Sequence, residues 1–237
     1  MAKLLLLSNS TLPGTPFFTW PRPWVKEFLG KTSKNLVFVP FAAVTFPMDE
    51  YEAIVKKAFA EMGYTLNSLH TIADKEKAIR EAGAIVTGGG NTFALLSRMY
   101  DQKLITPVRE AVMNGTPYIG WSAGANLACP TIMTTNDMPV VQPPSFEALN
   151  LVPFQINPHY HELRFEGQGG ETRKDRLEEF LVMNPHRAVV GLPEGMLVQC
   201  EGNAMILRGE GKAKLYQAGK VLLEIEPGTD INSLLTN

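Results

Sequence analysis

The chain alternates short apolar runs with amphipathic segments over most of its length. This alternation predicts βαβ units, in which helices join the parallel strands of one sheet. The apolar runs predict strands at residues 3–8, 35–42, 64–70, 84–89 and 116–121. We therefore expect the α/β class, with a mostly parallel sheet.

Three segments between or after these runs predict helices. One apolar helix face is formed by residues at helical spacing, namely Tyr51, Ile54, Val55, Ala58, Phe59 and Met62. Residues 73–83 predict an exposed helix that ends at a glycine. Residues 172–184 predict a third helix, with Leu177, Phe180 and Leu181 on one face.

The pattern changes in the second half of the chain. Residues 134–161 are rich in proline, so we expect an irregular loop with one short strand near 154–156, and long loops in compact domains are usually functional. A further strand and turn are expected at 187–195. Short β-like runs split by glycines from 196 to 225 predict a meander of antiparallel hairpins packed on the parallel sheet. We expect one α/β hydrolytic domain over residues 1–237.

Composition excludes several classes of partner. The chain is 45% hydrophobic and 19% charged, with a net charge of -2, so it lacks the positive charge that a nucleic-acid backbone requires. The opening apolar run is too short for a signal peptide, and no run approaches the roughly 20 residues of a membrane-spanning helix. Cys129 and Cys200 lie far apart without metal-ligand spacing, which indicates buried, reduced thiols. We expect a cytoplasmic protein without nucleic-acid or membrane partners.

Ser122 lies between Gly120 and Gly124, where a strand-like run gives way to small, helix-compatible residues. In a nucleophile elbow, small neighbours permit a sharp strand-to-helix turn that exposes the serine oxygen. The same residues are also compatible with a tightly packed α/β connection without catalytic function. Both interpretations stay open on the motif alone.

A serine nucleophile needs a base, and the chain has four histidines. His70 and His186 occupy positions that suit a structural role. His159 follows Pro158, which fixes the backbone before it, so His159 is the better candidate, and His161 is the next.

Two carboxylates are candidates for orienting the imidazole of His159. Asp137 lies in the loop between Ser122 and His159, whereas Glu194 follows an apolar strand. Either carboxylate could accept the imidazole N–H, and spacing does not separate them.

The segment TGGGNTF, residues 87–93, follows a predicted strand and precedes a helix. Its glycines leave backbone N–H groups open to a phosphate or a tetrahedral oxyanion, although a tight packing turn would need the same residues. The spacing matches neither G-x-G-x-x-G nor the Walker pattern, which argues against a nucleotide.

The motifs GGGNT, GWSAGAN, TTNDMP, INPHY and GLPEG occur in this order, with LLLLSNSTLPG and FVPFA before them. Together they resemble the S51 family of serine peptidases, from the first strand to about Gly195. The resemblance implies a class I glutamine-amidotransferase-like (flavodoxin-like) fold with helices on both faces of the sheet. It also implies hydrolysis of dipeptides with an N-terminal aspartate, without a metal or cofactor.

The resemblance implies catalytic roles for several residues. Ser122 falls on the nucleophile of the family and His159 on its base, while Asp137 and Glu194 both fall on positions credited with the acidic role. An oxyanion hole would be formed by amides of the glycine loop, around Gly89 and Gly90, together with the amide of Ala123.

Substrate-binding residues are also implied. Arg173 falls on a position associated with the aspartate side chain, and a guanidinium binds a carboxylate with two parallel bonds. A solvated arginine at the start of a charged helix would look the same in sequence. Glu171 and Asn91 are candidates for contacts with the ammonium group and the peptide.

We expect a small peptide substrate and a monomer or homodimer. One alternative is an S51 relative that cleaves β-linked aspartyl chains, as cyanophycinases do. Another is a non-catalytic flavodoxin-like module in which the glycine loop binds an anion.

Overall fold

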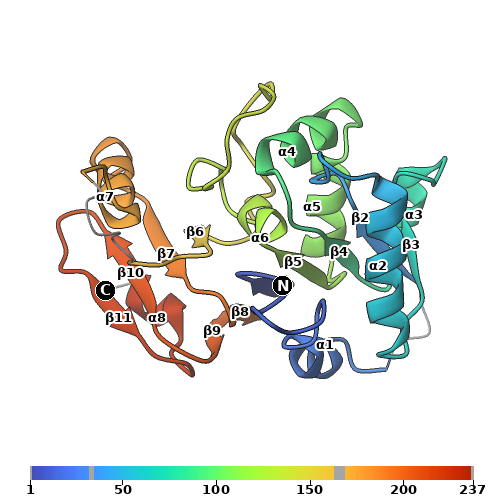
Figure 1. The fold of residues 1–237 in the computed structure, drawn as a ribbon, viewed down its shortest axis with the longest axis horizontal. Helices are drawn as coiled ribbons and strands as arrows, with labels where there is room; N and C mark the ends of the chain where they lie inside the picture. Colours follow the sequence, from blue (N-terminus) through green and yellow to red (C-terminus); the bar gives the residue numbers. More distant parts are fainter. Residues whose placement is uncertain (1, 32–34, 163–168, 236–237) are drawn as a thin grey trace.

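The computed structural model describes residues 2–31, 35–162 and 169–235, and these form a seven-stranded sheet with a four-stranded sheet beside it (Figure 1). The larger sheet has the strand order β3-β2-β4-β5-β1-β8-β9. Its parallel part consists of β1 (Lys3–Leu7), β2 (Leu36–Val39), β3 (Leu66–Ser68), β4 (Ile85–Thr87) and β5 (Tyr118–Trp121). The prediction of an α/β fold with a mostly parallel sheet is confirmed.

Helices cover both faces of this sheet because its strands are apolar on both sides. Leu5 and Leu7 face a core cluster shared with α1 (Arg22–Leu29) and α2 (Met48–Ala60). Leu4 and Leu6 face the opposite cluster, to which the remaining helices of the parallel part contribute. These are α3 (Lys75–Glu81), α4 (Thr92–Asp101), α5 (Ile105–Met113) and α6 (Ala123–Leu127). The helices expected on both faces are therefore present.

The apolar face predicted for α2 is correct except at Ile54. Tyr51, Val55, Ala58 and Phe59 are buried, whereas Ile54 is 50% exposed. At about 100° per residue, Ile54 lies at the edge of the arc that the buried residues define. It therefore borders solvent while its neighbours pack on the sheet.

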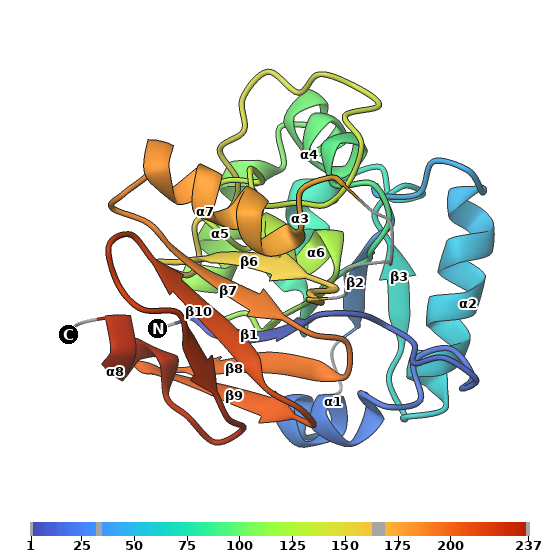
Figure 2. The ribbon, with the colours of Figure 1, turned by 60° about the vertical axis from the view of Figure 1, so that its left-hand side comes forward.

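The smaller sheet has the order β11-β10-β7-β6. Its strands are β6 (Gln155–Pro158), β7 (Ala188–Leu192), β10 (Ala213–Gln217) and β11 (Leu223–Ile225). β6 and β7 are parallel, and β10 is antiparallel to both β7 and β11. Helix α7 (Arg173–Met183) lies against this sheet (Figure 2). Its buried residues Leu177 and Leu181 pack in one cluster with Val189 of β7 and Tyr216 of β10.

The predicted C-terminal meander is divided between the two sheets. β8 (Met196–Glu201) pairs antiparallel with β1 and then with β9 (Ala204–Gly209), so this hairpin extends the parallel sheet at its edge. The hairpin of β10 and β11 belongs to the smaller sheet instead, and α8 (Ile231–Leu235) follows it. The hairpins were predicted correctly, but they do not pack on the parallel sheet as one unit.

Among the described residues, no helix combines the length and apolarity needed to cross a bilayer. Between α6 and β6 the chain forms an irregular loop, as its prolines predicted.

Candidate active site

Several polar segments meet where neighbouring strands of the parallel sheet end. β4, β5 and β1 are adjacent and parallel, so the residues after them lie along one edge of the sheet. These are Gly88 to Gly90 after β4, Ser122 after β5 and Ser8 after β1. Ligand sites of open α/β sheets form at such carboxyl edges.

Ser122 occupies a sharp turn between β5 and α6. Its φ is 53° and its ψ is -113°, which is an unusual conformation for a residue with a side chain. Both flanking glycines are required by contact: a Cβ at Gly120 would overlap the carbonyl oxygen of Gly124, and one at Gly124 would overlap that of Thr87. The G-x-S-x-G motif therefore forms a strained strand-to-helix turn.

His159 connects Ser122 to Glu194. Nε2 of His159 lies 2.9 Å from Oγ of Ser122, and Nδ1 lies 2.7 Å from Oε1 of Glu194. A carboxylate can only accept, so it fixes the proton on Nδ1 and leaves Nε2 as the acceptor for the serine hydroxyl. This geometry permits proton transfer from serine to imidazole.

The backbone of His159 is held by residues that the sequence did not indicate. His159 has a φ of 51°, and its N–H donates to Oγ of Ser8 at 2.8 Å. The buried Ser8 hydroxyl donates in turn to the carbonyl of Leu192 at 2.8 Å. Next to it, Oδ1 of Asn9 accepts from the N–H of Gly195 at 3.0 Å. The sequence did contain one signal for Ser8 and Asn9, because both directly follow a buried parallel strand.

Asp137 does not hydrogen-bond to the imidazole, since both ring nitrogens of His159 have other partners. Oδ2 of Asp137 instead accepts from the N–H of Thr92 at 2.7 Å and from its hydroxyl at 2.6 Å. Thr92 begins α4, where free N–H groups favour an anion. Of the carboxylates that spacing left open, the structure brings Glu194 to the histidine and Asp137 to the start of α4.

The glycine loop borders the serine. A Cβ at Gly89 would lie 3.0 Å from Cβ of Ser122. Gly90 has a φ of 132°, and a side chain there would overlap the carbonyl oxygen of Ala42. Gly89, Gly90, Ser122 and His159 line a cavity of about 320 Å³. Ala123 is the first residue of α6, so its N–H has no intrahelical acceptor.

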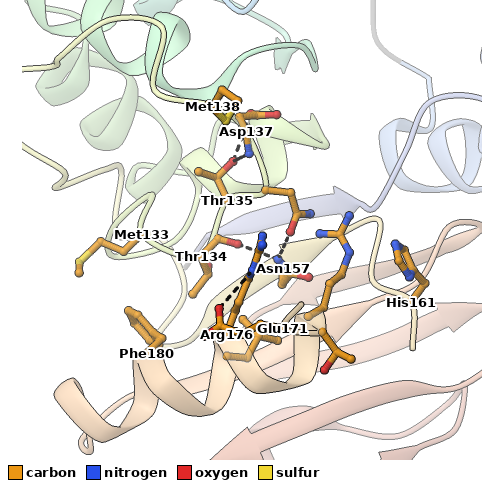
Figure 3. Close-up of a pocket in the computed structure, with 14 residues that line it drawn as sticks. Met133, Thr134, Thr135, Asp137, Met138, Asn157, His161, Glu171, Arg176 and Phe180 are labelled. Atoms are coloured by element: carbon orange, nitrogen blue, oxygen red, sulfur yellow. Dashed lines mark hydrogen bonds and ion pairs between the residues drawn. The ribbon is translucent and has the colours of Figure 1, made fainter. Parts of the chain in front are cut away.

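A second cavity of about 380 Å³ lies between the loop after α6 and helix α7 (Figure 3). Thr135, Asp137 and Met138 of the loop lie across it from Arg176 and Phe180 of α7. Asn157 of β6, the strand that leads to His159, also lines this cavity.

Arg173 lines the same cavity at the start of α7. Its Nε is buried and has no hydrogen-bond partner among the residues that the structure describes. Burial, with a smaller contribution from the charge of Arg176, lowers the pKa of Arg173 below its ordinary value. A buried guanidinium nitrogen without a partner is costly, and an anionic ligand would compensate for it.

The other predicted substrate residues have different surroundings. Asn91 caps α4: its Oδ1 accepts from the N–H of Ala94 at 3.0 Å, and its Nδ2 donates to the carbonyl of Met138 at 2.8 Å. Glu171 lines the cavity of Arg173, with Oε2 3.9 Å from Nε of Arg176. His161 also lines it, and burial and then the charge of Arg173 lower the pKa of His161.

One group of potential metal ligands occurs within the described ranges. Asp49, Glu52 and His70 place ligand atoms within 4.8 Å of one another at the edge formed by α2 and β3. Nε2 of His70 lies 2.8 Å from Oδ1 of Asp49, so the pair is already satisfied by a hydrogen bond. No described contact links this group to Ser122.

An α/β fold in which a serine, a histidine and a carboxylate are in contact defines a hydrolase with a serine nucleophile. The family model described as peptidase family S51 matches residues 4–208. The chain is 47% identical over 233 residues to peptidase E of Nostoc sp., covering 98% of this chain and 96% of that protein. It is 46% identical to peptidase E of Salmonella newport, covering 95% and 98%.

Solved structures share the fold. A putative peptidase E from Listeria monocytogenes superposes with a TM-score of 0.67 at 24% identity, covering 89% of this chain and all of that one. A peptidase from an acI-B1 actinobacterium superposes with a TM-score of 0.72 at 14% identity, covering 97% and 96%.

The chain belongs to peptidase family S51. It is a serine peptidase, and its substrates are peptides, as the order of motifs predicted. Its similarity to peptidase E over nearly the full length supports an aspartyl dipeptidase of this family.

Proposed function

We propose that this chain hydrolyses dipeptides with an N-terminal aspartate, using Ser122 as nucleophile, His159 as base and Glu194 as the orienting acid. The observation that carries the proposal is the continuous contact from Glu194 through His159 to Ser122, at 2.7 Å and 2.9 Å. Distances of this size permit proton transfer without rearrangement.

In the first step, Oγ of Ser122 attacks the peptide carbonyl while Nε2 of His159 accepts its proton. The oxyanion is stabilised by the amide of Ala123 and an amide of the glycine loop, at Gly89 or Gly90. The imidazolium, stabilised by Glu194, then protonates the leaving amine. Water resolves the acyl-enzyme by the reverse sequence.

Selection for aspartate follows from the surroundings of Arg173. Arg173 lines a cavity that also contains Asn157, two residues before His159. Its buried Nε has no hydrogen-bond partner in the described part of the chain. A β-carboxylate would complete the hydrogen bonding of the guanidinium. Glu171 lines the same cavity and offers a carboxylate to the α-ammonium group. Asn91 would contact the peptide only by giving up part of its capping role at α4.

The test of the mechanism is Asp-Leu hydrolysis by the Ser122→Ala variant. We expect turnover to fall by at least about a thousandfold, because the nucleophile is lost. Near-normal turnover by a folded variant would exclude the mechanism. Asp137→Asn is the matched control, since its carboxylate contacts Thr92 rather than the histidine.

Arg173→Met tests the aspartate site. Loss of a charge-assisted pair should lower kcat/KM for Asp-Leu by about 10- to 100-fold and change the value for Asn-Leu far less. Arg176→Met is the control, because Arg176 lines the same cavity but has its Nε near Glu171. Equal losses on both substrates would rule out a carboxylate-binding role for Arg173.

We further propose an oligomeric state and a location for this chain. We expect a monomer or a homodimer, and sedimentation velocity distinguishes these states. A cytoplasmic location is supported by Cys129 and Cys200, which are both free and buried.

A further inference from the structure

The hydroxyl of Tyr51 lies directly beneath the glycine loop. The sequence assigned Tyr51 only to the apolar face of α2, and the residue is 7% exposed. Its hydroxyl donates to the carbonyl of Gly89 at 3.1 Å and accepts from Nε1 of Trp121 at 3.1 Å. Trp121 is the residue before the nucleophile, so this chain of bonds joins the serine turn to the glycine loop.

The direction of both bonds is determined by chemistry. The indole nitrogen of Trp121 can only donate, so the single phenolic proton of Tyr51 is available for the Gly89 carbonyl. Burial raises the pKa of Tyr51 above its ordinary value, and the hydroxyl therefore remains a donor at all working pH values. The ring is fixed by edge-on contacts with Phe38 and Phe46, at centroid distances of 5.1 Å and 5.2 Å.

The bond to Gly89 sets the orientation of the next amide. In a planar trans peptide, the carbonyl and the following N–H point in opposite directions, and no described peptide bond is cis. Holding the carbonyl of Gly89 on Tyr51 therefore turns the N–H of Gly90 away from Tyr51.

The next peptide of the loop is fixed as well. The N–H of Asn91 donates to the carbonyl of Ala42 at 2.9 Å. Without the hydrogen bond from Tyr51 to the carbonyl of Gly89, the loop would retain rotational freedom at Gly89 and Gly90, because these residues lack the Cβ that restricts others.

We propose that Tyr51 is a positioning residue for the oxyanion hole: by holding the carbonyl of Gly89, it aims the N–H of Gly90 at the oxygen that becomes negative during attack. This inference rests on the proposed function of Ser122. It assigns Trp121 an auxiliary role, since its indole N–H orients the Tyr51 hydroxyl. An amide held in place before the reaction stabilises the transition state without a reorganisation cost.

The test compares Tyr51→Phe with Tyr64→Phe. Both changes remove a tyrosine hydroxyl that donates to a glycine carbonyl, and Tyr64 does so at Gly30, on the loop after α1. We expect Tyr51→Phe to lower kcat for Asp-Leu about tenfold, with KM within about twofold. Tyr64→Phe should leave both constants unchanged.

The affinities for two ligands distinguish positioning of the oxyanion hole from a purely structural role of Tyr51. The boronic-acid analogue of aspartate forms a tetrahedral adduct on serine, so its affinity should fall in Tyr51→Phe by the same factor as kcat/KM. Free aspartate, which has no tetrahedral oxyanion, should bind unchanged. Trp121→Phe should lower kcat about two- to threefold, and it provides the measurement if Tyr51→Phe does not fold.

Normal kcat and normal boronate affinity in Tyr51→Phe would overturn the inference, as would an equal loss of boronate and aspartate affinity. Ser122→Ala, measured in parallel, separates this failure from failure of the proposed function. An inactive Ser122→Ala beside a fully active Tyr51→Phe contradicts only the role of Tyr51, whereas an active Ser122→Ala contradicts both.

Discussion

At the scale of single residues, the serine and the histidine share a positive φ, which is uncommon for a residue with a side chain. Ser122 has a φ of 53° and His159 a φ of 51°, and such conformations cost roughly 1–3 kcal/mol outside glycine. At Ser122 the turn is stabilised by a 3.0 Å bond from its N–H to the carbonyl of Leu7. At His159 the buried hydroxyl of Ser8 accepts the N–H. The surrounding polar contacts therefore maintain both strained residues.

Glu194→Gln should lower kcat by about 10- to 1000-fold, because an amide no longer stabilises the imidazolium or fixes its tautomer. Asp137→Asn should leave kcat within about threefold and lower the free energy of unfolding by roughly 1 kcal/mol, since it weakens an anionic contact at the start of α4. Steady-state kinetics and urea unfolding of both variants provide the measurements. The opposite pattern would assign the catalytic acid to Asp137.

At the scale of elements, the contact between α6 and the ends of β4 and β5 forms the serine turn. Gly124 lies against the carbonyl of Thr87, and Gly120 against the carbonyl of Gly124. The buried hydroxyl of Tyr118 donates to that same Gly124 carbonyl at 2.7 Å. The helix can approach the strands this closely only because neither position has a Cβ.

Gly124→Ala should therefore displace α6 from β4. Overpacking of this kind costs about 1–3 kcal/mol or more, and the accompanying shift of Ser122 should lower kcat at least tenfold. Gly170→Ala is the control, because no atom of the described residues beyond its chain neighbours lies within 4 Å of the position its Cβ would take. Thermal unfolding and turnover of the two variants test the expectation. Unchanged kcat in Gly124→Ala would show that the turn tolerates a shifted helix.

The elements that depend on local pattern were predictable from the sequence. The five parallel strands and helices α2 and α3 follow from apolar runs and helical spacing, and the G-x-S-x-G motif located the turn, whereas α1 and α5 were not predicted. The partner of β10 could not be predicted, because pairing with β7 depends on contacts distant in sequence. For the same reason spacing could not separate Asp137 from Glu194.

The contacts made by the hydroxyls of Tyr51 and Ser8 were not predicted from the sequence either. Tyr51 fits an apolar helix face, and nothing in that pattern indicates that its oxygen reaches Gly89. Ser8 was more accessible to prediction, because a polar residue directly after a buried parallel strand lies at the edge where sites form.

At the scale of the whole molecule, burial in the apolar interior raises the pKa of both thiols. Cys129 and Cys200 are free and buried, and burial raises the pKa of each to about 12. The folded-state values exceed the ordinary value of 9.0, so the thiols in the unfolded chain ionise first as pH rises. Their contribution to stability is complete below about pH 9 and is lost as pH rises through about 12.

The free energy of unfolding should accordingly decrease between pH 8 and pH 10, by about 1 kcal/mol for each thiol. Urea titrations at the two pH values measure the decrease. The free energy of unfolding of Cys200→Ala should decrease less between pH 8 and pH 10 than that of the parent chain, whatever its value at pH 8. Equal pH dependence in the variant and the parent chain would mean that the Cys200 thiol does not contribute.

The catalytic contact also joins separate parts of the architecture. Ser122 follows β5 of the larger sheet, whereas His159 follows β6 of the smaller one, and Glu194 lies in the connection from β7 to β8. The 2.9 Å distance from serine to imidazole therefore depends on how the sheets are docked. A slight separation of the sheets would abolish hydrolysis while each sheet kept its own hydrogen bonds. We therefore expect peptidase activity to report on the docking of the two sheets, a property that neither sheet has on its own.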